Sequence, residues 1–205
     1  MLFSFFLSIY KSYFAVRRRK FGYIDKTSFV RLPSIIKGIQ NVYLYENTHL
    51  LSNSLILATR AKFIMKKNSG AAEGLTVVCG NHFSKVGRTF MSITDAEKSK
   101  ELDKDIIVEE DVWLATNVTL LSGVVVGRGA AVGSGSVVRR PVPPYAVVFG
   151  NPAKVVGFKF TPEEVIEHEK VLYPEEERLP LELLEKNYKK FFLDRLPEIK
   201  SFTRI

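Results

Sequence analysis

The chain has 205 residues, 46% of them hydrophobic, and a formal net charge of +8. This length supports one sizeable core and is too short for two large domains. The single cysteine, Cys79, excludes an internal disulfide framework and fits a reducing compartment. The sequence shows no zinc-ligand spacing, helix-turn-helix or aromatic RNA-binding motif, so we expect no metal and no nucleic-acid partner. The basic charge favours solubility and anionic ligands.

Residues 1–16 are expected to form a helix with aromatic side chains over much of its surface, and the basic run Arg17–Lys20 follows. In a secretory signal the positive charge precedes the apolar region, whereas here it follows. The apolar stretch, interrupted by Lys11, is also too short to span a bilayer. Two interpretations stay open: the helix caps the fold or packs on another subunit, or residues 1–20 lie in a membrane surface. We expect a cytoplasmic protein, peripheral at the inner face of the membrane in the second case.

A six-residue repeat dominates the second half of the chain. Aliphatic residues recur every six positions, at Val108, Leu114, Leu120, Val126, Val132 and Val138. Four positions after each of them stands a small or β-branched residue. Two interlocked registers at one period predict a chain that coils into a parallel β-helix. Each short segment cannot bury its apolar face alone, so neighbouring coils must stack.

A looser form of the same register precedes this run. Leu44, Leu50 and Ile56 continue the aliphatic series, but Lys62 falls out of step. We therefore predict bulged or inserted residues near Phe63–Lys66, with Leu75 and Cys79 restoring the spacing. Residues 39–160 form the predicted β-helix domain, preceded by the N-terminal helix and a connector in residues 1–38.

The periodicity vanishes between His82 and Ile106, where the sequence is polar and too long for an ordinary turn. Loops of this length inside a compact domain are usually functional or disordered. We predict that residues 83–106 form a loop protruding from the wall of the β-helix.

The composition changes again in residues 161–205, which we assign to a helical extension. Thr161 and Pro162, followed by two glutamates, are typical of a helix start. That helix is expected to end near Tyr173, before Pro174. A second amphipathic helix is predicted from Leu181 to about Leu196, stopped by Pro197.

The segment Asp105–Gly157 resembles the hexapeptide-repeat acyltransferases, in the branch of maltose, galactoside, xenobiotic and surface-polysaccharide O-acetyltransferases. The resemblance rests on Asp111–Trp113, Gly133–Val138, Pro143-Pro144, Gly150–Lys154 and the upstream pair Asn81-His82. It implies a left-handed β-helix, an acetyl-CoA donor and a homotrimer with active sites between subunits. The general preference for right-handed crossovers would have given the opposite hand.

His82 matches the catalytic histidine of that family, and a neutral imidazole is a good base near neutral pH. We expect a ternary complex with direct attack on the thioester, because Cys79 falls on an inward position and is interpreted as a packed core residue. The residues expected to contact or shape the acceptor site are Asn81, Phe83, Arg88 and Phe90, with Asp95 as a candidate to orient His82.

The resemblance also implies a cofactor groove along stacked coils. Trp113, Ala115, Gly133 and Ser134 would line the pantetheine arm, where small residues let it approach backbone amides. Leu114-Ala115 departs from the isoleucine-glycine common in the family. The nucleotide end would be met by Arg139, Arg140, Asn151, Pro152 and Lys154. Alternatively, Gly133 and Gly135 only serve tight corners, and the two arginines lie on a solvated corner.

These observations predict an acetyl-CoA-dependent O-acetyltransferase acting on a saccharide, such as a surface polysaccharide or its precursor. A small-sugar or xenobiotic acetyltransferase is the alternative within the class. The zinc-dependent carbonic anhydrases that share the fold need three histidine ligands. This chain has only His49, His82 and His168, and the last lies in the predicted tail helix. A purely structural solenoid would leave His82 and its loop unexplained.

Overall fold

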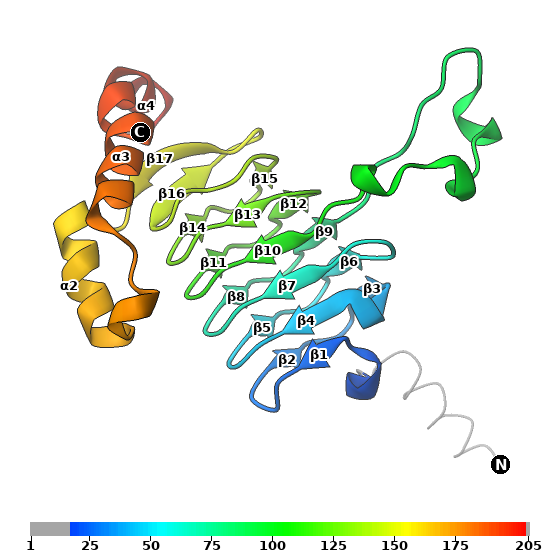
Figure 1. The fold of residues 1–205 in the computed structure, drawn as a ribbon, viewed down its shortest axis with the longest axis horizontal. Coiled ribbons are helices and arrows are strands. Elements are labelled where there is room, and N and C mark those ends of the chain that lie inside the picture. Colours follow the sequence, from blue (N-terminus) through cyan, green and yellow to red (C-terminus); the bar gives the residue numbers. More distant parts are fainter. Residues whose placement is uncertain (1–16, 204–205) are drawn as a thin grey trace.

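A computed structural model describes residues 17–203 of the chain (Figure 1). The helix predicted over residues 1–16 lies outside the described part. From Tyr23 onward the chain winds into a prism with three walls, each a sheet of short strands. All neighbouring strands are parallel except the last pair, β16 and β17. The parallel β-helix predicted from the repeat is therefore present.

The three walls are named here by their strands. Sheet A contains β1 (Tyr23–Ile24), β4 (Val42–Leu44), β7 (Phe63–Met65), β10 (Ile106–Val108) and β13 (Val125–Val126). Sheet B contains β2 (Phe29–Val30), β5 (His49–Leu50), β8 (Gly70–Ala71), β11 (Trp113–Leu114), β14 (Ala131–Val132), β16 (Ala146–Phe149) and β17 (Lys154–Phe158). Sheet C contains β3 (Ile35–Lys37), β6 (Leu55–Leu57), β9 (Thr76–Val78), β12 (Thr119–Leu121) and β15 (Val137–Val138).

The core is a stack of aliphatic side chains that point into the prism. Leu120 of β12 lies between Val77 of β9 and Val138 of β15, and all three are buried. The same stacking repeats on the other two walls, because strands one coil apart pair residue for residue. The six-residue spacing is what returns an aliphatic residue to the interior on each wall.

The early coils correct three details of the predicted register. The first coil begins at Tyr23, so residues 29–37, predicted to be a connector, contain strands of the prism. The extra residues lie at 58–62, before β7, and not in a bulge at Phe63–Lys66. Val77, not Leu75, occupies the aliphatic column, since Thr76 pairs with Thr119 and places Leu75 beside Val118. Each error arises because added residues change the number of residues per coil, while the coils still stack in register.

All these added residues lie on the edge where sheet C passes into sheet A, here called the C/A edge. They comprise residues 38–41, residues 58–62 and, the longest, residues 79–105 between β9 and β10. Residues 79–105, here called the arm, reach away from the prism as the green segment of Figure 1. The arm contains three short 3-10 turns at Phe90–Ser92, Asp95–Glu97 and Lys100–Leu102. One edge of the prism therefore carries the irregular structure.

The C-terminal extension begins with α2 (Pro162–Leu172), which Thr161 caps by accepting a hydrogen bond from the Glu164 amide. Helix α3 (Leu181–Phe191) ends earlier than predicted, and Pro197 does not terminate it. Pro197 instead lies in the first turn of a further helix, α4 (Leu196–Phe202). This position suits proline because the first amides of a helix have no intrahelical acceptor. Within residues 17–203, no helix is long and apolar enough to cross a membrane.

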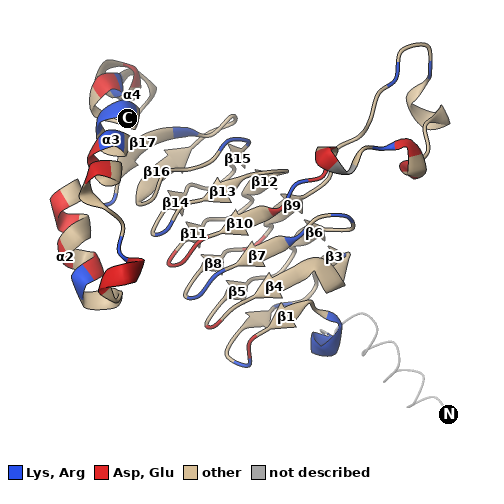
Figure 2. Cartoon of the chain, in the orientation of Figure 1, with Lys and Arg blue, Asp and Glu red and all other residues tan. Residues whose placement is uncertain are grey.

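A buried carboxylate ties this extension to the prism. Glu169 of α2 accepts hydrogen bonds from the Tyr145 hydroxyl at 2.9 Å, the Arg128 guanidinium at 3.3 Å and the Leu179 amide at 2.6 Å. Burial, reinforced by Glu169, raises the pKa of Tyr145, so the phenol remains a donor. Figure 2 shows that charged residues are dense on these helices and sparse on the strands of the prism. The helices are thus attached through a satisfied polar network.

Candidate active site

His82 lies at the foot of the arm, on the C/A edge, four residues beyond the end of β9. Its side chain is exposed, and its ring packs edge-on against Phe90 with centroids 4.8 Å apart. A cavity of about 300 Å³ adjoins it, lined also by Phe83, Met91, Asp95 and Lys98. The predicted base therefore faces a space that a small polar acceptor could enter.

The foot of the arm is held by Asp103, a residue that the sequence analysis missed. Its side chain is only 2% exposed and contacts Lys98, the Arg60 Nε at 3.0 Å and the Asn81 amide at 3.1 Å. Burial alone would raise the pKa of Asp103, but the contacts with Lys98, Asn81 and Arg60 outweigh it and lower that pKa. Asp103 lies in an acidic and basic run, and nothing in the sequence separates it from its charged neighbours.

Asn81 contributes to the same closure. Its side-chain amide donates to the Leu102 carbonyl at 3.0 Å, and its backbone N–H reaches Asp103. A Cβ on Gly80 would lie 2.9 Å from the Asp103 carboxylate, so a larger residue here would displace that carboxylate. The donors of Asn81 thus fix the backbone beside His82, while its predicted contact with the acceptor stays a prediction.

Arg88 and Asp95, further along the arm, are also engaged differently from the expectation. The Arg88 guanidinium donates to the Ser92 carbonyl and hydroxyl and to Glu97 at 3.0 Å, which shapes the outer arm. The Asp95 side chain is almost fully exposed. In the part of the chain that the structure describes, no carboxylate hydrogen-bonds the His82 ring.

The residues expected along the pantetheine arm lie on sheet B and at the edge between sheets B and C. Trp113 is half-exposed on β11, with its ring beside Gly70 of the preceding coil. The amides of Ala115 and Gly133 donate to Val132 and Val148 within the prism, so a cofactor could not use them. The coil-to-coil ladder therefore occupies these two amides, and the predicted cofactor groove along these coils stays a prediction.

Gly133 and Ser134 have a different surrounding from the one predicted. A Cβ on Gly133 would lie 2.6 Å from the Phe149 ring, which packs over this glycine. Of the two glycines considered for a tight corner, Gly135 has a left-handed φ of +70° and serves it. Ser134 is exposed beside them.

The residues expected at the nucleotide end cluster at the C-terminal end of the prism. Arg140 and Lys154 line one cavity of about 250 Å³, while Asn151 and Pro152 are exposed in the turn between β16 and β17. Arg139 is exposed at the end of β15. The structure thus brings Arg140 and Lys154 together, as a phosphate-binding role would require.

One chain does not bring all these groups to one place. His82 leaves the prism at the C/A edge, whereas Trp113 lies on sheet B and Gly133 follows β14 at the opposite side of sheet C. Edges of one prism cannot approach each other. The predicted base and the predicted pantetheine groove therefore lie on different parts of one chain.

Cys79 is buried as predicted, but it occupies a different position in the six-residue repeat from the one predicted. It lies just beyond β9, where its thiol is 3.4 Å from the Lys62 carbonyl. Burial raises the pKa of this thiol to about 12, with a smaller contribution from Asp105. A protonated, enclosed thiol is a poor nucleophile, so Cys79 acts in packing.

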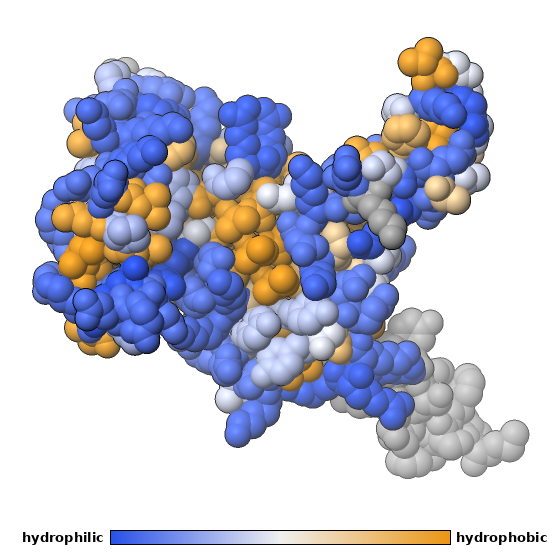
Figure 3. Space-filling model, viewed as in Figure 1, coloured by the Kyte–Doolittle hydropathy of each residue, from blue (hydrophilic) through white to orange (hydrophobic). Residues whose placement is uncertain are grey.

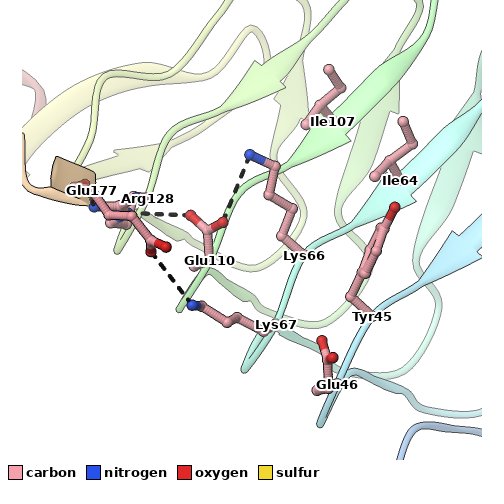
Figure 4. A pocket seen from close by; sticks show the side chains of 9 residues that line it. All are labelled: Tyr45, Glu46, Ile64, Lys66, Lys67, Ile107, Glu110, Arg128 and Glu177. Carbon is pink, nitrogen blue, oxygen red and sulfur yellow. Dashed lines mark hydrogen bonds and ion pairs between the residues drawn. The ribbon is translucent and has the colours of Figure 1, made fainter. Parts of the chain in front are cut away.

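A further cavity, about 550 Å³, lies over sheet A and contains none of the predicted site residues (Figure 4). Its charged groups pair with one another: Lys66 with Glu110, Lys67 with Glu177, and Arg128 with Glu110. Figure 3 shows an apolar patch on this face of the prism. The outward residues of sheet A on this face are Tyr43, Ile64, Ile107 and Val125, all partly exposed.

Within residues 17–203, no group of histidine, cysteine or acidic residues is arranged to hold a metal ion.

Comparison with known proteins gives matches to the repeat and to the fold. Residues 105–140 match the bacterial transferase hexapeptide family of six repeats. A hexapeptide-repeat acetyltransferase from Vibrio cholerae, solved with acetyl-CoA, gives a TM-score of 0.61 at 25% identity, over 69% of this chain and 73% of its own. No curated protein matches the chain significantly.

Two further solved structures share the fold at lower identity. A maltose O-acetyltransferase from Clostridium difficile gives a TM-score of 0.57 at 22% identity, over 67% of this chain and 70% of its own. A galactoside acetyltransferase in complex with coenzyme A gives 0.59 at 19% identity, over 80% and 74% of the two chains. Together these findings confirm the predicted resemblance to the hexapeptide-repeat acyltransferases and their left-handed parallel β-helix, here with C-terminal helices. They also support the class of enzyme, an acyltransferase.

Proposed function

We propose that the chain is an acetyl-CoA-dependent O-acetyltransferase whose acceptor is a hydroxyl of a saccharide, such as a surface polysaccharide or its precursor. The observation that carries the proposal is His82, exposed at the foot of the arm beside an open cavity of about 300 Å³. Phe83 and Phe90 offer faces on which a sugar ring can pack. The acetyl-CoA complex of the Vibrio cholerae acetyltransferase supports the donor.

In the proposed reaction, the neutral imidazole of His82 takes the proton of the acceptor hydroxyl as its oxygen attacks the thioester carbonyl. The acetyl group passes directly to that oxygen, the carbon–sulfur bond breaks, and the departing thiolate recovers the proton from the imidazolium. No acyl-enzyme is involved, because the Cys79 thiol is buried and its pKa is raised.

We further propose a homotrimer in which the site forms between subunits. Two observations support it: His82 and Trp113 lie on different parts of one prism, and sheet A presents a partly exposed apolar face. In such an assembly, the arm of one subunit meets the groove of its neighbour. Light scattering on purified protein should give a mass three times that of one chain, and a monomer would contradict this arrangement.

The test of the activity is a set of acetyl-transfer assays with acetyl-CoA and a panel of saccharides, read by mass spectrometry of the acceptor. His82→Ala should lower kcat by about 10² to 10⁴, the usual contribution of a general base. The matched control is His49→Gln, a histidine on the wall that stacks on Phe29. Full turnover in the His82 variant would overturn the proposed mechanism.

Localisation is part of the same proposal. A donor made in the cell interior and a single cysteine support a cytoplasmic enzyme, and the exposed basic run Arg17–Lys20 could meet anionic lipid, although Arg18 already donates to the Ser28 and Asp25 carbonyls. Flotation of the full chain with vesicles containing phosphatidylserine, compared with neutral vesicles, tests the membrane contact. Equal recovery with both would leave the cytoplasmic location without a lipid contact.

A further inference from the structure

Helix α4 packs beside the turn that joins β16 to β17, Gly150–Lys154. The Phe202 ring lies 6.5 Å from that of Phe149, and a Cβ on Gly150 would be 3.2 Å from Phe202. Ile199, on the same helix, is buried. These apolar contacts hold α4 next to residues that the family resemblance assigns to the nucleotide end of the cofactor.

A carboxylate of α4 lies between two cations at this place. Glu198 accepts a hydrogen bond from Arg195 Nε at 3.0 Å and another from Lys154 Nζ at 3.0 Å, one on each oxygen. Arg195 first, and then Lys154, lowers the pKa of Glu198 to about 2. The carboxylate therefore stays ionised at any physiological pH, and an anion that binds the two cations must compete with it.

Both cations also line the cavity of about 250 Å³ described above, together with Arg140. The rest of its lining is apolar or neutral, including Pro141 and Phe191, and no acidic side chain lines it among the described residues. A small cavity with three basic groups and an apolar floor suits a phosphate ester, whose charge is attached to a less polar body.

We propose that this cavity binds a phosphate of the cofactor's nucleotide end, and that Glu198, outside the cavity, binds Lys154 and Arg195 when no cofactor is bound. The inference rests on the proposed function and deepens it. Arg195 becomes a further binding residue, and Glu198 becomes an internal competitor. Both lie in the C-terminal extension, outside the segment that resembles the family.

The competition has a definite sign. A phosphate brings more negative charge and more acceptor oxygens than a carboxylate, so it can displace Glu198 from both cations. In the absence of cofactor, Glu198 pairs with the two cations in a fraction of the molecules. The measured affinity for the cofactor is reduced according to that fraction. Because exposed ion pairs are weak, the reduction should be about two- to fivefold.

The experiment is calorimetric titration of the full chain with coenzyme A and with pantetheine, which has the thiol arm but no phosphate. Glu198→Gln should bind coenzyme A about two- to fivefold more tightly than the wild type, with pantetheine unchanged. Arg195→Gln should bind coenzyme A more weakly by a similar factor. Glu185→Gln removes an equal charge from an exposed position of α3 and should match the wild type.

Dephospho-coenzyme A then identifies the phosphate. If the gain in Glu198→Gln is lost with this ligand, the 3′-phosphate occupies the site; if the gain persists, the pyrophosphate does, and either result supports the inference. Unchanged or weaker binding of coenzyme A by a folded Glu198→Gln variant would overturn it, while acetyl transfer continued. A wild-type chain that bound neither coenzyme A nor pantetheine would instead overturn the proposed function itself.

Discussion

The prism and the arm are stabilised by different interactions. Inside the prism, Leu114, Leu120 and Val126 are fully buried and contact equivalent side chains of neighbouring coils. In the arm, Val86 and Met91 are almost fully exposed, and the structure depends on polar contacts at its foot and along its length. The comparison indicates that the free energy of folding resides in the prism, while the position of His82 depends on a few charged contacts.

The largest effect should come from a cavity in the prism. Leu120→Ala removes a fully buried side chain between two coils and should lower the free energy of unfolding by about 2–5 kcal/mol. Met91→Ala, in the arm, should change it by less than about 0.5 kcal/mol. Denaturant titration followed by circular dichroism measures both. Equal losses in the two variants would contradict the division between prism and arm.

The next effect should be confined to the arm. Asp103→Asn leaves Lys98 and Arg60 without their buried carboxylate and should destabilise the closed foot by about 1–3 kcal/mol, less than for a fully buried pair because both cations are partly exposed. Limited proteolysis should then cut the arm faster, while the unfolding midpoint of the prism changes little. Asp95→Asn, an exposed carboxylate of the same arm, is the matched control.

Lowering the pH should also loosen the arm of the wild-type protein, because it protonates Asp103. Because the pKa of Asp103 is lowered in the folded chain, its contribution is complete above the ordinary carboxyl pKa of about 3.9 and is lost as the pH falls below it. Glu97 adds a dependence of the same sign, since hydrogen bonds from Thr94 and Arg88 lower its pKa. Proteolysis of the arm with an acid-stable protease should accelerate below about pH 4. In Asp103→Asn it should be fast throughout, with a weaker dependence on pH.

Cys79 allows a test with a smaller effect. Cys79→Ala deletes one buried sulfur next to the foot of the arm and should cost about 1 kcal/mol of stability. The rate of acetyl transfer should stay within about twofold, because direct transfer involves no thiol of the enzyme. A folded variant with no turnover would show that the acetyl group passes through Cys79.

The sequence predicted the parts of the fold in which local pattern and packing agree. Val108, Leu114 and Leu120 stack because the six-residue spacing returns an aliphatic residue to the interior on every wall. Thr161 with Glu164 predicted the start of α2 for a similar reason, since the capping contacts lie within four residues.

The parts that escaped prediction depend on contacts between distant residues. Asp103 meets Arg60 across 43 positions, and Glu169 meets Arg128 across 41, so their surroundings follow only from the completed stack. The added residues at 58–62 lie on one edge, where they shift the spacing of the sequence but not of the coils. Local periodicity therefore placed Leu75 in the wrong column, although Val77 fills the aliphatic position.

The smallest effect distinguishes two roles for Arg88. Its guanidinium bonds Ser92 and Glu97, which supports a role in shaping the arm, whereas the sequence suggested a contact with the acceptor. Glu97→Gln weakens the same ion pair and leaves the arginine in place. If Arg88 only shapes the arm, Arg88→Gln and Glu97→Gln should each loosen it by less than about 1 kcal/mol and should change the KM for the acceptor by similar small factors.

Hydrogen exchange of the arm and steady-state kinetics on both variants measure the two quantities together. A KM that rises tenfold or more in Arg88→Gln alone, with equal exchange in the two variants, would assign Arg88 to acceptor binding, because a charge-assisted hydrogen bond to a saccharide would then be missing. Similar KM values would instead mean that Arg88 acts on the acceptor only through the shape of the arm, which positions His82.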